Sequence, residues 1–239
     1  LVDITEQKRI ERTLQATAEF EDAIASISRS FINLMPKEVD EGIRRALETI
    51  GAAYHVERAY VLQFSGDRSR MTCTHEWCAQ GIKPQMDKLK DLPIDHFRWT
   101  VEQIMRSQVV QVRSGSDLPP EAGAERAEFG ALGLEARLVI PMVYQGVPVG
   151  LVGFDTTRVR QWTWQSLKLQ VIGDIIVNAL EHRRAQEIQA GQRQFLELLA
   201  TGGGFSETLH TLVRLIEAQW PGMLGLILLL DEDGRHLHI

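Results

Sequence analysis

The sequence predicts an α+β domain built around a largely antiparallel sheet. Two hairpin patterns are the first observation: β-rich runs at 58–65 and 71–77 flank Gly66-Asp67-Arg68-Ser69, and runs at 136–144 and 147–156 flank Gln145-Gly146. The second observation is helical periodicity before, between and after these hairpins. With a short run at 109–112, five strands and at least four helices are expected, with helices packed against a sheet.

The composition is that of an ordinary soluble domain. Of 239 residues, 44% are hydrophobic and 24% charged, enough to bury a core. The net charge of -6 offers no basic surface, so we expect no nucleic-acid partner. The longest apolar run, 224–230, is too short to cross a bilayer, so no membrane contact is expected in this segment. Two cysteines and no signal peptide favour a reducing cytoplasm.

Two helices are predicted ahead of the first hairpin. The first begins near residue 4 and continues to about residue 34 without Gly or Pro. Its apolar residues recur at spacings of 4, 3, 4 and 3, which is one helical stripe: Phe20, Ile24, Ile27, Phe31 and Leu34. Upstream, only Ile10 and Leu14 continue the stripe, so the first half needs a partner helix or solvent. The second helix follows Pro36 and is predicted to stop at Gly51.

The rest of the chain alternates irregular and helical segments. Residues 84–106 mix helix and loop signals, and 121–131 reads as a helix rich in Glu and Ala. A long helix is expected after Trp164, and its polar part at 181–194 should project from the domain as a connector. Beyond Gly202-Gly203-Gly204, an amphipathic helix, a strand at 223–230 and a turn repeat the order seen at 37–77. We therefore expect a second, related domain to begin there.

No common enzyme signature is present: the sequence lacks a phosphate-binding loop, a GxGxxG fingerprint, a GxSxG elbow and an HExxH pair. The densest polar cluster is Cys73-Thr74-His75-Glu76-Trp77-Cys78. Strand alternation predicts that Cys73, His75 and Trp77 share one face and that Cys78 lies on the other, so the two thiols cannot share a metal ion. We expect His75 and Trp77 to line the space between the sheet and its covering helices, with a metal or redox role as the alternative.

A small-molecule pocket is the main candidate site, and its residues have structural alternatives. The middle segment carries Phe97, Trp99, Met105 and Phe129, which could form plain core or wall a pocket. Arg126 and Arg137 are anion anchors or surface residues. Asp155 ends a hydrophobic strand, where a turn or capping role is favoured over a catalytic one because no second carboxylate converges on it in the sequence.

Several motifs resemble those of a known family. They are Thr-His-Glu-Trp-Cys at 74–78, Val-Glu-Arg-Ala-Tyr at 56–60, Asp-Leu-Pro at 91–93 and 117–119, Val-Ile-Pro-Met at 139–142, and the run from Gly146 to Phe154. Residues 20–182 thus resemble a bacterial GAF domain. The resemblance implies about six antiparallel strands between a helix layer used for dimerisation and a cover over a small-molecule pocket. The pocket candidates are then His75, Trp77, Phe97, Trp99, Met105, Arg126, Phe129 and Arg137.

The flanks resemble parts of neighbouring domains. Asp3-Ile4-Thr5 is similar to the end of a PAS domain, so residues 1–19 are expected to be that end and its signalling helix. Residues 183–194 would form a helical linker, and 195–239 look like the truncated start of a second GAF domain. The chain would then be a fragment cut from a longer protein.

The resemblance implies a sensory and dimerisation module of a cytoplasmic bacterial signalling protein, expected to be a sensor histidine kinase of a two-component phosphorelay. Alternatives are an input module of a diguanylate cyclase or cyclic-di-GMP phosphodiesterase, a free methionine sulfoxide reductase, and a ligand-free spacer. The segment itself is expected to be non-catalytic, with no metal, and no feature indicates bilin, haem or cyclic nucleotide. Expected partners are a small molecule, a downstream transmitter or cyclase domain, and a second copy of the chain. The signalling and dimer contacts are assigned to Leu14, Ile24, Ile27, Phe31, Ile172, Ile176 and Leu180.

Overall fold

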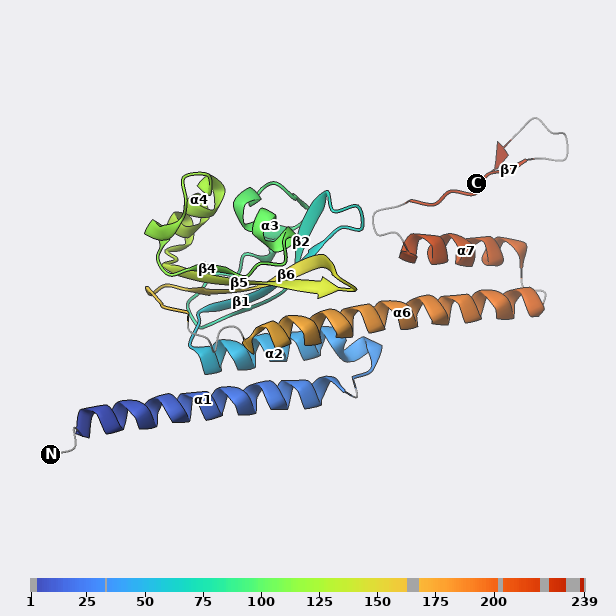
Figure 1. Ribbon diagram of the computed structural model, residues 1–239. Coiled ribbons are helices and arrows are strands. Elements are labelled where there is room, and N and C mark those ends of the chain that lie inside the picture. The colour runs from blue at the N-terminus through green and yellow to red at the C-terminus, as the bar shows by residue number, and fades with distance from the viewer. Residues whose placement is uncertain are drawn as a thin grey trace. The chain divides into compact units, whose positions relative to one another are not determined.

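The computed structural model describes residues 4–32, 34–162, 168–201, 204–219, 224–230 and 237–238 (Figure 1). By its internal contacts the chain divides into two compact units, Leu1–Leu180 and Glu181–Ile239. The first unit holds the sheet and the candidate site. No helix among the described residues is long and apolar enough to span a bilayer.

The first unit contains a six-stranded sheet in the order β3-β2-β1-β6-β5-β4, and every neighbouring pair is antiparallel. The strands are β1 Arg58–Phe64, β2 Arg70–Cys78, β3 Leu92–Pro93, β4 Val110–Val112, β5 Ala136–Tyr144 and β6 Val147–Thr156. Both predicted hairpins, β1-β2 and β5-β6, form, and they join through β1 and β6 at the centre of the sheet. The predicted α+β fold class is therefore confirmed.

Helices cover both faces of this sheet (Figure 1). One face carries α1 Ile4–Phe31, α2 Val39–Tyr54 and the beginning of α6 Gln170–Ala200, and the short η1 Pro36–Glu38 precedes α2. The other face carries a cover made of α3 Arg98–Met105, α4 Gly123–Leu132 and two single turns, η2 Met86–Leu89 and η3 Gly115–Asp117. Each face has its own buried apolar cluster, and the sheet separates the two.

Most of the residues assigned to signalling contacts lie in the helix-side core of this same unit. Ile27, Ile172, Ile176 and Leu180 are buried there, and Ile24 and Phe31 pack against them partly buried. Leu14 differs, since 65% of its surface is exposed. The predicted apolar stripe is thus mainly an intradomain packing surface, because α2 and the sheet cover it.

The predicted end of the second helix is wrong. Gly51 lies inside α2, which continues to Tyr54, and His55 ends the helix in the left-handed conformation with φ of 51°. Gly51 is buried beside the ring of Trp77, so its missing side chain makes room for an aromatic residue of β2. The glycine here is a packing requirement rather than a helix stop.

The second unit consists of the later part of α6, then α7 Phe205–Gln219 and a short antiparallel pair, β7 Leu229–Leu230 with β8 Leu237–His238. Leu215 of α7 packs against Gly191 of α6 and is buried. Of the strand predicted at 223–230, only the last two residues form a strand, and Met223 and the predicted turn at 231–234 lie outside the described residues.

Candidate functional site

The Thr-His-Glu-Trp-Cys strand contains an irregularity that decides which side chains face the cover. In the β1-β2 pairing, Val61 lies opposite His75 and Leu62 lies opposite Cys73, so no residue of β1 lies opposite Thr74. A bulge of one residue reverses the alternation of side chains on either side of it. Cys73 therefore keeps its place on the cover face, whereas His75 turns to the opposite face.

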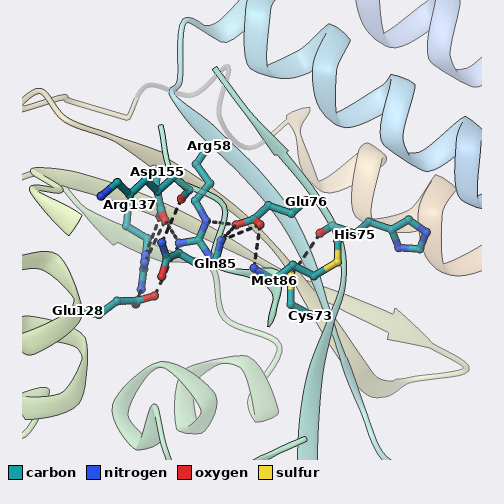
Figure 2. A network of polar contacts seen from close by, with 10 residues as sticks. Arg58, Cys73, His75, Glu76, Gln85, Met86, Glu128, Arg137 and Asp155 are labelled. Atoms are coloured by element: carbon teal, nitrogen blue, oxygen red, sulfur yellow. Dashed lines mark hydrogen bonds and ion pairs between the residues drawn. The ribbon is translucent and has the colours of Figure 1, made fainter. Parts of the chain in front are cut away.

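The prediction that His75 and Trp77 line the space under the cover is wrong for this reason. The His75 ring is buried on the helix side, where its Nε2 lies 3.1 Å from Oδ1 of Asp40 at the start of α2. Figure 2 shows this ring pointing away from the cover network and toward the helices. Trp77 packs into the helix-side cluster against Gly51. Both residues connect β2 to α2 instead of facing the cavity.

A small cavity lies between the sheet and the cover. Its volume is about 10 Å³, room for roughly one water molecule. Its wall is mostly apolar and comes from the sheet, η2, α3 and α4: Tyr60, Leu62, Met71, Leu89, Phe97, Thr100, Val101, Glu128, Arg137, Val139 and Leu151. In this state the cover is closed down onto the sheet.

Two of the predicted pocket residues, Phe97 and Arg137, line this cavity. Phe129 is buried in the same cluster, with its ring centre 5.0 Å from the Arg137 guanidinium carbon. Trp99 and Met105 pack against the cluster partly buried. Arg126 is elsewhere, because its exposed side chain donates hydrogen bonds of 2.7 and 3.1 Å to the carbonyl oxygens of Leu118 and Pro119.

Beside the cavity, two arginines share one fully buried carboxylate (Figure 2). Arg137 of β5 donates from Nε to Oδ1 of Asp155 at 2.7 Å and from Nη2 to Oδ2 at 3.0 Å. Arg58 of β1 donates from Nη1 to Oδ2 of the same carboxylate at 3.0 Å. Asp155 lies opposite both arginines in the strand register, so the sheet itself holds this triad in place.

Two further carboxylates extend the triad toward the cover. Glu128 of α4 accepts a hydrogen bond of 2.8 Å from Arg137 Nη1 and lies 3.7 Å from Arg58 Nη1. Glu76 of β2 accepts from Arg58 Nε at 2.7 Å and from the backbone N–H groups of Gln85 and Met86 at 2.9–3.0 Å. The five side chains therefore tie α4 and the η2 turn to the central strands.

Comparison with solved structures identifies the fold. No family model matches the sequence. Among solved structures, a phycocyanobilin-bound GAF domain from a cyanobacterial phytochrome aligns with TM-score 0.55 at 17% identity, covering 72% of this chain and 96% of that one. A GAF domain of a phosphoenolpyruvate-protein phosphotransferase from Coxiella burnetii aligns with TM-score 0.60 at 12% identity, covering 72% and 98%. The chain has the GAF-domain fold.

One curated protein also shows sequence similarity to this chain. The methanogenesis regulatory histidine kinase FilI of Methanothrix harundinacea is 26% identical over 152 residues, which is 62% of this chain. The match spans 17% of that kinase, so the GAF segment corresponds to a small part of it.

The two arginines of this network are held in their ionised forms. Burial opposes a charge on Arg58 and on Arg137, but Asp155 raises the pKa of both, and Glu128 adds to this effect. Burial raises the pKa of Tyr60, whose ring lies with its centre 4.3 Å from the Arg58 guanidinium carbon. The arginines are therefore permanent cations and Tyr60 stays a neutral phenol at physiological pH.

The two thiols are poorly suited to nucleophilic chemistry. Burial and the negative charge of Glu76 raise the pKa of Cys73 to about 12 and that of Cys78 to about 11.

The bulge at Thr74 places Cys73 and Cys78 on the same cover face of the sheet, whereas the sequence predicted that they lie on opposite faces. Among the residues that the structure describes, no group of three His, Cys, Asp or Glu side chains is arranged to hold a metal ion.

The sequence reasoning missed Arg58, Glu76, Glu128 and the true setting of Asp155. The predicted turn or capping role for Asp155 is wrong, because its carboxylate is fully buried between two guanidinium groups. Pairing residues outward from the turn of the β5-β6 hairpin would have placed Arg137 opposite or next to Asp155. Arg58 lies 97 residues from Asp155 in the chain, so only the pairing of the two hairpins reveals it.

Proposed function

We propose that this chain is a signal-input module of a multidomain sensor histidine kinase. Its GAF fold and the similarity of 62% of the chain to one kinase support this proposal. The observation that carries it is helix α6, which begins buried in the helix-side core and then continues without interruption from Gln170 to Ala200. A change in that core therefore acts directly on a helix that extends beyond the GAF unit.

The signal is proposed to start at the cover. A cavity of about 10 Å³ has no room for a metabolite, so a ligand must bind a state in which the cover has moved. Such a ligand shifts the equilibrium only by its differential affinity for the open and closed states. The five-residue charge network joins the cover to β1, β5 and β6, and the opposite faces of these strands bear on the helix-side core.

Helices α1 and α6 are proposed to carry the change onward. The ammonium of Lys168, just before α6, pairs with the carboxylate of Glu21 on α1, so the two helices are connected at the surface of the unit. We further propose that a second copy of the chain pairs through exposed apolar residues such as Leu14 of α1. We also propose that PAS and GAF domains flank this module in the parent protein. The parent protein would act in a phosphorelay in the cytoplasm.

A ligand-free spacer is the second candidate, because the closed and nearly filled cavity favours it. The two candidates differ in whether any small molecule stabilises the chain. We would screen the purified chain against a metabolite library by thermal shift and native mass spectrometry. A ligand present at 100 times its Kd should add about 2.7 kcal/mol to the free energy of unfolding.

Hydrogen exchange across residues 170–200 then tests transmission. A sensor requires that the stabilising ligand change amide protection in α6, whereas no stabilising molecule and unchanged α6 protection would establish the spacer. The kinase assignment is tested on the full gene product that contains this segment. It should incorporate phosphate from ATP onto a histidine, and a ligand-dependent cyclase or phosphodiesterase activity without such labelling would contradict the kinase assignment.

A further inference from the structure

The charge network contains one more carboxylate than it needs. Two guanidinium groups, from Arg58 and Arg137, face three carboxylates, from Glu76, Glu128 and Asp155. Asp155 and Glu76 come from the sheet and already balance the two positive charges. Glu128 is the surplus anion, and it is the one member that the cover helix α4 supplies.

Glu128 is also the member of this network most exposed to solvent, and it lines the cavity. Its side chain is 15% exposed, compared with 5% or less for the other four. Both Glu128 and Arg137 line the cavity, and a hydrogen bond of 2.8 Å joins them. An anion that entered the cavity would therefore meet Arg137 at the position that the Glu128 carboxylate now occupies.

Two buried side-chain polar atoms, one in the charge network and one on the cavity wall, have no hydrogen-bond partner among the described residues. They are Nη2 of Arg58, whose side chain is 1% exposed, and Oγ1 of Thr100, which lines the cavity and belongs to a residue that is 5% exposed. Buried polar atoms are normally satisfied, and an unsatisfied one indicates a missing partner. Spare donors beside an arginine are the groups that would bind additional carboxylate oxygens.

We propose that Glu128 is a built-in surrogate for the ligand's anionic group, and that the module senses a small apolar carboxylic acid. The acid's carboxylate replaces that of Glu128 on Arg137, and its hydrocarbon part contacts the apolar wall formed by residues such as Leu62, Met71 and Leu151. This inference rests on the sensory function proposed above and names the ligand class and the regulation of that site.

The chemistry of the exchange selects a monocarboxylate. One carboxylate leaves and one enters, so the charge of the buried network is unchanged, which avoids the cost of an unpaired charge in the interior. A guanidinium group binds a carboxylate through parallel hydrogen bonds in a plane. A neutral amide of the same shape supplies neither the charge nor the second acceptor, so it should not displace Glu128.

The exchange also gives the ligand a way to move the cover. Glu128 is the charged contact between α4 and the sheet, whereas Glu125, one turn earlier, accepts a hydrogen bond of 2.9 Å from the backbone N–H of Thr100 in α3. Once Glu128 is displaced, α4 stays linked to α3 but loses its ion pair with Arg137 of β5. We expect the two cover helices to separate from the sheet together.

The test uses 3-methylbutanoate as the probe and 3-methylbutanamide as its neutral isostere, titrated into the purified chain and followed by protein NMR. The variant Glu128→Gln removes the competing charge but keeps the side-chain shape. It should bind 3-methylbutanoate about 10- to 100-fold more tightly than the wild type, the ratio expected for one hydrogen bond to a charged group. Glu121→Gln is the matched control, because Glu121 is exposed just before α4, and it should bind as the wild type does.

A second measurement does not depend on any variant. In the wild type, 3-methylbutanoate should accelerate amide exchange across residues 123–132, and 3-methylbutanamide should not. Equal affinity for acid and amide, unchanged affinity in Glu128→Gln, or unaltered exchange of α4 would each overturn the inference. If neither protein binds the acid while the metabolite screen finds another ligand, the surrogate inference fails and the sensory function stands.

Discussion

The indole ring of Trp77 lies directly against the backbone of Gly51. A Cβ atom built on Gly51 would be 2.2 Å from Cζ3 and 2.5 Å from Cε3 of this ring. A bulky ring in the helix-side core cannot move away without disturbing its neighbours, so Gly51→Ala should overpack the contact between α2 and β2. We expect it to lower the free energy of unfolding by about 1–3 kcal/mol, measured by urea denaturation.

Gly130→Ala is the matched control, since Gly130 lies inside α4 with no atom within 4 Å of an added Cβ. There the substitution should raise the free energy of unfolding by up to about 1 kcal/mol, because alanine favours the helix. A Gly51→Ala protein as stable as the wild type would show that Trp77 is not packed as described.

Removing the charge of Asp155 should be strongly destabilising. Asp155→Asn leaves Arg58 and Arg137 buried without their shared anion, and breaking a buried pair in this way costs about 3–5 kcal/mol. Urea denaturation of the variant that folds measures the decrease in the free energy of unfolding. Asp87→Asn is the control, because the pair of Asp87 with Lys90 is on the surface, and it should leave the free energy of unfolding nearly unchanged.

The native thiols should react slowly with alkylating reagents. A pKa of about 11 for Cys78, raised from 9.0, reduces its thiolate fraction at pH 8 roughly 100-fold. Iodoacetamide labelling at pH 8, read by mass spectrometry, should therefore be much slower in native protein than in urea. Cys73 is buried and should be labelled more slowly than the half-buried Cys78. Rapid labelling of Cys73 in the native state would contradict its placement.

Stability should fall in alkaline solution. The folded state holds the thiol protons of Cys73 and Cys78 up to about pH 12 and 11, whereas the unfolded chain loses them near pH 9. The unfolded state therefore binds fewer protons above pH 9, and the free energy of unfolding decreases as the pH rises from there. Below pH 9 these groups contribute no slope. Urea midpoints at pH 8, 9 and 10 measure the effect. The midpoint of the Cys78→Ser variant should decrease less steeply over this range than that of the wild type.

The sequence by itself determined the fold class and most of the element positions. Alternation with a period of two located both hairpins, and their turn residues determined where β1-β2 and β5-β6 reverse. Helical periodicity located α1 and α6. Ile27 of α1 and Ile172 of α6 belong to the apolar stripes of these helices and are buried, as expected for amphipathic helices. These features depend on residues close together in the chain, so a single sequence is enough to read them.

Only the tertiary structure decided the composition of the site. Alternation assigns side chains to the correct face of the sheet only while the strand pairing is regular. The extra residue Thr74 reverses the alternation in β2, so His75 faces the helix side and Glu76 faces the cover. The triad of Arg58, Arg137 and Asp155 depends on β1 and β6 lying side by side. That neighbourhood arises from the packing of two hairpins far apart in sequence, and no local pattern of residues records it.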